Sequence, residues 1–361
     1  MTLSHAIANK PLPEVTNLQA LWQCFFHEKQ LLETMIEQAY QSDIPLITQI
    51  CHNLFAAGGK RLRPLLTIAC AQLMADWQSI KPNEAQKNNM VGLATAIEYL
   101  HAASLLHDDV IDNSDKRRGK ATANALWGNE AAVLVGDFVF ASAFELMTRH
   151  GNMANLALLS HTTQHLAKGQ VAELVNAHNL TQSLNDYIEM VSLKTAWLFK
   201  AAAKIGAQLF MKGGDGITHQ AVENIGEYGL QLGLSFQLID DYMDYASSEG
   251  KMGKALGDDF FEGKVTFPIL LLYQAASNTE QAWLQACFDA EHQRTQEEFL
   301  RIKQMMHTHH IADENQRYAA QSVEKAIAAL TNFGLDPNFE FDSGVLKLLI
   351  DFANDTLLRQ A

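Results

Sequence analysis

Proline and cysteine are scarce in this 361-residue chain. The distribution of proline bears on the fold class, and the cysteine pattern bears on the cellular compartment. None of the seven prolines falls between Pro82 and Pro268, and that stretch is rich in Ala, Leu, Glu and Gln. It therefore predicts helix after helix, and we find no alternating β-branched run that would indicate strands. The four cysteines show no CxxC pairing, so we expect free core thiols in a reducing compartment.

A surplus of positive charge is also missing. The chain has 27 Lys and Arg against 41 Asp and Glu, a net charge of −14. This argues against general nucleic-acid binding, which needs a basic face, and against electrostatic docking on anionic lipid. No uncharged apolar run reaches about 18 residues, so we expect no membrane span. With no apolar segment typical of a secretory signal near the start, we expect a cytoplasmic protein.

Periodicity divides the chain into helices and polar connections. We predict a flexible tail over 1–16 and a single all-α domain over 17–361. Polar or glycine-rich connections are expected at 78–88, 113–120 and 246–264. Helices are expected over 18–40, 45–58, from 64, over 89–112, 129–149, 153–178, 185–211 and 218–245, and from 265 onward.

One acidic pattern occurs twice, with carboxylates at i, i+1 and i+4. The two copies are Asp108, Asp109, Asp112 and Asp240, Asp241, Asp244. Carboxylates at i and i+4 share a helix face and repel, so the helix gains nothing from them. Each copy follows an apolar stretch, and a buried carboxylate cluster needs cations. Hard oxygen ligands with room for water and phosphate suit Mg²⁺, so two facing clusters would hold a substrate diphosphate.

Basic residues accompany both acidic motifs. A glycine turn with three cations, GGKRLRP, spans Gly58–Pro64 and leads into a helix N-terminus. The run RRGK at 117–120 follows the first motif, and Lys254 and Lys264 follow the second. Helix N-termini and Lys or Arg side chains both favour phosphate. The arrangement suits two anionic substrates, one held by metal and one held by basic side chains.

These motifs, in this order, resemble those of the trans-polyprenyl diphosphate synthases. The resemblance runs from Gly58 to Pro268, and HDDVIDNSDKRRGKATAN followed by VLVGDF is similar to the octaprenyl-forming bacterial members. It implies an isoprenoid-synthase bundle of helices around a deep central cavity, in a homodimer. It also implies repeated condensation of isopentenyl diphosphate onto an allylic diphosphate such as farnesyl diphosphate. The product would be an all-trans chain, octaprenyl (C40), for a quinone side chain.

The same resemblance implies a role for each matching residue. All six motif aspartates would serve Mg²⁺, with three ions per site when substrate is bound. The residues implied to be catalytic are Asp108, Asp109, Asp112, Asp240, Asp241 and Lys194. Those implied to hold isopentenyl diphosphate are Lys60, Arg63, His101 and Arg118. Those implied to hold the allylic diphosphate are Arg117, Lys194, Thr195, Gln237, Lys254 and Lys264.

Chain length is predicted from the positions one turn before Asp108. Ala103 and Ser104 are small, whereas large aromatics there would block a growing chain. We therefore expect a tunnel open beyond C20, closed at a deeper level by Met147, whose flexible side chain can fill an irregular gap. Peripheral association with a membrane for product release is a further expectation.

Several alternatives stay open. The product could be shorter (geranylgeranyl) or longer (nona- or decaprenyl). A class I terpene cyclase is disfavoured because its second metal motif is usually an Asn/Asp-Ser/Thr-Glu pattern and it needs no isopentenyl site. A non-catalytic synthase subunit is disfavoured because such subunits typically lose acidic motifs. His161 and His165 stand at i and i+4, a spacing that can bind zinc, but the sequence suggests no third ligand for such a site.

Overall fold

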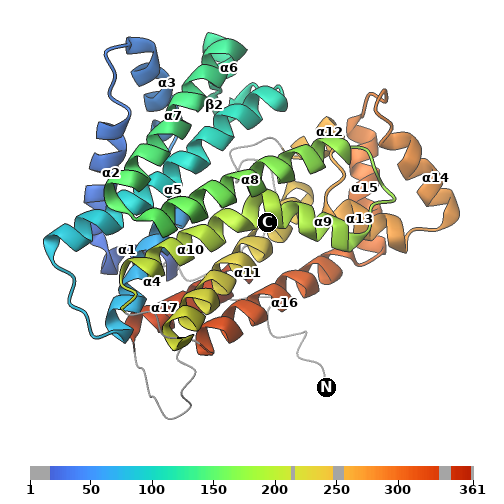
Figure 1. The fold of residues 1–361 in the computed structure, drawn as a ribbon. Coiled ribbons are helices and arrows are strands. Elements are labelled where there is room, and N and C mark those ends of the chain that lie inside the picture. The colour runs from blue at the N-terminus through green and yellow to red at the C-terminus, as the bar shows by residue number, and fades with distance from the viewer. Residues whose placement is uncertain (1–16, 213–215, 247–255, 333–342, 359–361) are drawn as a thin grey trace.

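The computed structural model describes residues 17–212, 216–246, 256–332 and 343–358 (Figure 1). The described chain is helical apart from one short two-stranded ribbon, which confirms the all-α prediction. The expected tail over 1–16 lies outside these residues. All four cysteines are free as predicted, although Cys24 is exposed rather than in the core.

The first half of the chain contains three long helices among shorter elements. Its elements are α1 (Asn17–Cys24), α2 (Phe26–Ala39), α3 (Pro45–Ala56), α4 (Leu62–Trp77), α5 (Glu84–Ile111), β1 (Lys116–Arg117), β2 (Lys120–Ala121), α6 (Ala123–Trp127), α7 (Asn129–His150) and α8 (Met153–Val175).

The second half begins with a helix interrupted by a π-helical turn, η2. Its elements are α9 (Leu184–Val191), η2 (Ser192–Ala196), α10 (Trp197–Leu209), α11 (Gly216–Ala246), α12 (Asp258–Glu262), α13 (Phe267–Ala275), α14 (Asn278–Cys287), α15 (Gln296–Thr308), α16 (Ile311–Thr331) and α17 (Gly344–Leu357).

Local signals explain several helix starts. α3 begins at Pro45, where the missing N–H of proline costs nothing. Asn83 caps α5 in a capping box with Gln86, so this helix begins five residues before the position expected from periodicity. The expected loop over 113–120 is wrong in part, because β1 and β2 pair antiparallel there.

The long helices pack side by side and bury a continuous apolar core. α5 contacts α4, α7 and α10, and α11 contacts α10, α16 and η2 (Figure 1). A second apolar cluster lies where α13, α14, α15 and α16 meet the C-terminal part of α11. Both acidic motifs stand at the C-terminal ends of the two longest helices, α5 and α11. The fold thereby places them where the charged connections begin.

One described helix, α7, is long and apolar enough to cross a bilayer by length and composition. It contains Asp137 and Glu145, and 39% of its most apolar window is buried inside the fold. It packs along α5 and also contacts α3, α6 and α8. A helix packed inside a bundle can have the same length and apolar composition, so these properties of α7 are weak evidence for a membrane span.

Candidate active site

Hydrogen bonds connect the region after the second acidic motif with the first motif. Lys264 Nζ lies 2.9 Å from Asp112 Oδ2 and 2.7 Å from Glu262 Oε2. The backbone N–H of Asp259, in α12, donates to Asp244 Oδ2 at 3.0 Å. The segment from α12 to Lys264 therefore contacts both acidic motifs.

The three aspartates of the first motif have different partners. Asp109 is buried, with 2% exposure; it accepts a hydrogen bond from Arg117 Nε at 2.9 Å and forms an ion pair with Arg117 Nη2 at 2.7 Å. Asp108 is only partly covered, and burial raises its pKa to about 6. Lys194 opposes that rise in pKa, whereas Asp112 and Glu173 add to it. Asp109 is therefore held by Arg117, whereas Asp108 and Asp112 are the two carboxylates spaced at i and i+4 on the helix face.

Two aspartates of the second motif are also engaged with protein donors. Asp241 is 3% exposed and accepts hydrogen bonds from Tyr187 Oη at 2.7 Å and Gln237 Nε2 at 2.8 Å. Burial raises the pKa of Asp241 to about 8, and Asp259 adds to the rise, while the two hydrogen bonds oppose it. Asp244 accepts the N–H of Asp259. The negative charge of Asp240, the remaining aspartate of this motif, interacts with Arg63 of α4 and favours the charged form of that guanidinium.

Basic side chains predicted to bind isopentenyl diphosphate come from three elements. Arg63 stacks over the ring of Phe199 at 4.4 Å. Burial lowers the pKa of Arg63 to about 10, and Arg118 adds to that effect. Arg118 Nη1 donates to the backbone carbonyl of Gly58, so the β1–β2 ribbon lies on the glycine turn before α4. A side chain at Gly59 would place its Cβ 2.9 Å from that Nη1.

His101 lies in the same basic environment. Its pKa is far below the usual value, mainly because of burial and further because of Arg63, Arg118 and Arg117. The imidazole is therefore neutral near pH 7, and it can offer a ring N–H to an anion without adding another charge.

Lys194 and Thr195 occupy the π-helical turn η2, a feature found frequently at functional sites. Lys194 Nζ forms an ion pair with Glu173 of α8. The backbones approach closely here, since a Cβ on Gly169 would lie 2.4 Å from the nitrogen of Lys194. Thr195 Oγ1 donates to Gln237 Oε1 at 3.0 Å, which links η2 to the second acidic motif.

The remaining predicted site residues are placed as follows. Lys254 lies outside the described residues. Lys60 is exposed. Ala103 and Met147 are fully buried, and Ser104 Oγ donates to the carbonyl of His101 at 2.8 Å. The rings of His161 and His165 are tilted against each other with centroids 4.2 Å apart, and both make T-shaped contacts with Trp197.

Sequence reasoning missed several residues that hold these groups. Glu98 lies three residues before His101 and pairs with Arg61 at 2.9 Å, a spacing that a search of the same helix face could have found. Tyr187 and Glu173 contact site residues 54 and 21 positions away. No local pattern marks them, because the contacts depend on how α8, α9 and α11 pack.

Comparison with known proteins agrees with this geometry. Residues 44–306 match the polyprenyl synthetase family. The chain is 34% identical over 307 residues to octaprenyl diphosphate synthase of Haemophilus influenzae, covering 85% of this chain and 88% of the relative. It is 38% identical to the Escherichia coli octaprenyl diphosphate synthase, covering 70% and 74%. Other relatives, 35% and 32% identical, carry heptaprenyl and nonaprenyl names.

Among solved structures, the chain is similar to a polyprenyl synthase from Caulobacter crescentus complexed with calcium and isoprenyl diphosphate. The TM-score is 0.85 at 36% identity, covering 95% of this chain and 98% of that chain. The fold and site thus define a prenyltransferase with an all-α isoprenoid synthase fold. This chain belongs to the polyprenyl synthetase family, and it is an enzyme that makes long-chain trans-polyprenyl diphosphates.

Proposed function

We propose that the enzyme condenses isopentenyl diphosphate repeatedly onto farnesyl diphosphate and releases all-trans octaprenyl diphosphate (C40). The observation that carries this proposal is the pairing of two anion sites. One is the carboxylate site at the ends of α5 and α11, which the segment from Asp259 to Lys264 joins and which would hold a diphosphate through metal. The other is the basic group of Arg63, Arg118 and His101, which shares an electrostatic environment with Asp240. A synthase needs both sites, whereas a terpene cyclase needs no isopentenyl site.

Mg²⁺ is the cofactor we propose, with three ions per site when substrate is bound. The residues fit it, because Asp108, Asp112 and Asp240 supply hard oxygen donors. Burial raises the pKa of Asp108 to about 6, and a cation bound beside this carboxylate would favour its charged form. Bound Mg²⁺ would supply positive charge to the leaving diphosphate.

The chain's own residues would divide the chemistry between the two substrates. Breaking the allylic C–O bond places negative charge on the leaving diphosphate, near Lys194, Arg117 and Lys264. Lys60, Arg63, Arg118 and His101 would orient isopentenyl diphosphate so that its double bond attacks the allylic carbon. Apolar helix walls would exclude water, which otherwise captures the cation. Loss of one proton, to the released diphosphate, completes each addition.

Asp109 and Asp241 have a different role in this proposal from the one the sequence suggests. Asp109 would orient Arg117, since it accepts a hydrogen bond from Nε and forms an ion pair with Nη2 of that residue. Asp241 would orient Gln237, which in turn accepts from Thr195. Both would then act on substrate through these partners, while Asp108, Asp112 and Asp240 act on metal.

The octaprenyl product is the finer part of the proposal. Its support is the similarity to two octaprenyl synthases and the small residues Ala103 and Ser104 before Asp108. Relatives of comparable identity are named for seven or nine isoprene units, so product length needs direct measurement. We further propose a cytoplasmic enzyme that supplies a quinone side chain and releases its product at a membrane surface.

We also propose that the enzyme is a homodimer. α7 and α8 expose large apolar side chains that the described chain does not cover. They are Val133, Leu134, Met153, Val171, Leu174 and Val175. A second copy packed on these helices would remove that surface from water.

Incubation of the purified chain with labelled isopentenyl diphosphate, farnesyl diphosphate and Mg²⁺ tests the proposal. After dephosphorylation, the products are sized by thin-layer chromatography or mass spectrometry. We expect a linear product at C40. A cyclised hydrocarbon would indicate a terpene cyclase, and turnover only after addition of a second protein would indicate a synthase subunit.

A further inference from the structure

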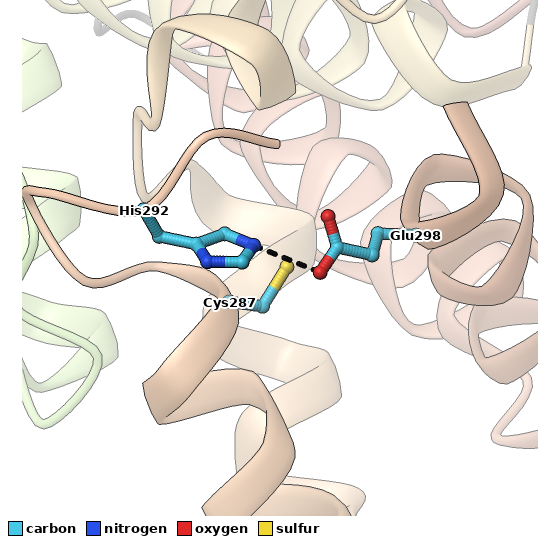
Figure 2. A group of neighbouring side chains, drawn as sticks. All are labelled: Cys287, His292 and Glu298. Carbon is cyan, nitrogen blue, oxygen red and sulfur yellow. Dashed lines mark hydrogen bonds and ion pairs between the residues drawn. The ribbon is translucent and has the colours of Figure 1, made fainter. Parts of the chain in front are cut away.

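A second group of converging donor atoms lies outside the candidate active site, between α14 and α15 (Figure 2). Cys287 is the last residue of α14, His292 lies in the connecting segment and Glu298 lies in the first turn of α15. One donor atom from each residue lies within 4.8 Å of the other two. This spacing would let the three donors share one metal ion.

The donors are held in place by the surrounding chain. Glu298 Oε2 accepts from Thr295 N at 2.8 Å and Thr295 Oγ1 at 3.0 Å, in the capping box of α15. Its other oxygen, Oε1, lies 2.8 Å from His292 Nε2. The sulfur of Cys287 lies beside this pair, and the residue is 1% exposed (Figure 2). Three separate segments thus present three donors to one point.

The nearby guanidinium of Arg294 is hydrogen-bonded to the backbone of the loop between α14 and α15. It donates to the carbonyls of Asp289 at 3.1 Å and His292 at 3.5 Å, and it stacks over Phe288 at 5.5 Å. Glu298 Oε1 faces His292 Nε2.

We propose that Cys287, His292 and Glu298 bind a Zn²⁺ ion. Sulfur, imidazole nitrogen and carboxylate oxygen form a ligand set typical of zinc, whereas Mg²⁺ and Ca²⁺ take oxygen ligands. Three protein ligands leave the fourth tetrahedral position to water. On binding, the Cys287 thiol releases its proton to solvent, and the His292–Glu298 hydrogen bond opens to admit the ion. His292 is about one-third exposed, at 34%, which provides access from solvent.

The position of this site gives it structural importance. Phe288 and Phe299, each next to a proposed ligand, pack against Phe260 of α12 with ring centroids 5.8 and 5.5 Å apart. α12 also contains Asp259, whose N–H donates to Asp244 of the second acidic motif. Zinc would join the end of α14 to the start of α15, next to the aromatic residues that pack against α12.

Cobalt substitution tests the site without any measurement of activity. Full-length protein, stripped of metal, is titrated with Co²⁺ in excess Mg²⁺, which keeps the carboxylate motifs occupied. We expect a thiolate-to-cobalt charge-transfer band that saturates at one equivalent and disappears when Zn²⁺ is added. The same Zn²⁺ should raise Tm.

Variants identify the ligands. Cys287→Ser should abolish the band, and His292→Ala or Glu298→Gln should weaken cobalt affinity by about tenfold or more. His307→Ala, at an exposed position of the same helix, and Cys24→Ser are matched controls that should keep the band. Far-UV circular dichroism checks folding, and His292→Ala, in a loop, tests the site even if Cys287→Ser is unstable. No band in the wild type, or an unchanged band in Cys287→Ser, would overturn the proposal.

Discussion

At the scale of single residues, Asp108 illustrates how burial changes the titration of a carboxylate. Burial and neighbouring acids raise its pKa to about 6, above the value of about 3.9 for an unfolded aspartate. The folded pKa is the higher one, so the contribution of Asp108 to stability is present below about pH 4 and is lost as pH rises through about 6. In metal-free protein, Asp108→Asn should therefore raise the free energy of unfolding at pH 7 and change it little at pH 4.

Urea unfolding in EDTA at the two pH values measures this difference. Asp313→Asn, at an exposed position, is the control. An equal effect of Asp108→Asn at both pH values would show that the carboxylate is not strained in the folded protein.

Arg63 tests how the two substrates are divided. We expect Arg63→Ala to raise KM for isopentenyl diphosphate, because a lost charge-assisted hydrogen bond costs about 1.5–3 kcal/mol, or roughly tenfold and more. KM for the allylic diphosphate should change much less. Steady-state kinetics with each substrate varied in turn give both values, with Arg301→Ala on α15 as the control. Equal increases in both KM values would reject the division.

Spacing in the sequence predicted the six motif aspartates but not their separate roles. The partners of Asp109, Asp241 and Asp244 are 8, 54 and 15 positions away. Only the packing of α9, α11 and α12 brings the last two pairs together. An i, i+4 pattern identifies a shared helix face, and it does not tell which carboxylate is engaged by protein donors.

At the scale of elements, a buried ion pair joins α2, α4 and α5. The Arg61 side chain is 8% exposed, pairs with Glu98 at 2.9 Å and Glu33 at 3.1 Å, and has a left-handed backbone with φ 48°. Removing one partner of a buried pair leaves an uncompensated charge and costs about 3–5 kcal/mol. Glu98→Ala should therefore lower the free energy of unfolding by about that amount.

Glu33→Ala is the matched control. Its side chain is 47% exposed, so its loss should cost about 1 kcal/mol or less. Denaturant unfolding of both variants measures the difference. Similar losses in the two variants would show that Glu98 does not neutralise Arg61 more effectively than Glu33 does.

Chain length also belongs to the elements, because it depends on how α5 and α7 pack. We expect Ala103→Tyr to shorten the product to C15–C20, since a large ring close to Asp108 blocks the growing chain. Met147→Ala should lengthen the product by removing the floor. Both positions are fully buried, so Ser104→Tyr, at a partly exposed position, serves as a second variant.

Mass analysis of the dephosphorylated products measures all three variants. An unchanged length distribution in both tyrosine variants would reject the tunnel along α5. No change in Met147→Ala would reject only the choice of floor.

The element boundaries show where sequence patterns end. Periodicity predicted one helix over 185–211, whereas the chain forms α9, η2 and α10. The π-helical turn lies against Gly169 of α8, where the two backbones meet. Such a turn depends on a contact between segments distant in sequence, so the helical periodicity of residues 185–211 does not predict it.

At the scale of the whole molecule, the all-α architecture followed from the proline-free stretch and the scarcity of strand signals. That the two acidic motifs act together was predicted from their spacing and apolar flanks, and the link through the segment from Asp259 to Lys264 appears only in the fold. The single domain over 17–361, the central cavity and the homodimer stay predictions. The exposed apolar side chains of α7 and α8 are the surface on which we propose that a second copy packs.

The central claim is that both acidic motifs act together in prenyl transfer. The most direct test is the turnover of Asp108→Ala and Asp240→Ala with labelled isopentenyl diphosphate, farnesyl diphosphate and saturating Mg²⁺, beside Asp313→Asn. We predict that kcat falls in each motif variant by more than the affinity for the allylic primer, because metal held by these carboxylates acts mainly in the transition state. Near-normal kcat in either variant in excess Mg²⁺ would contradict the account.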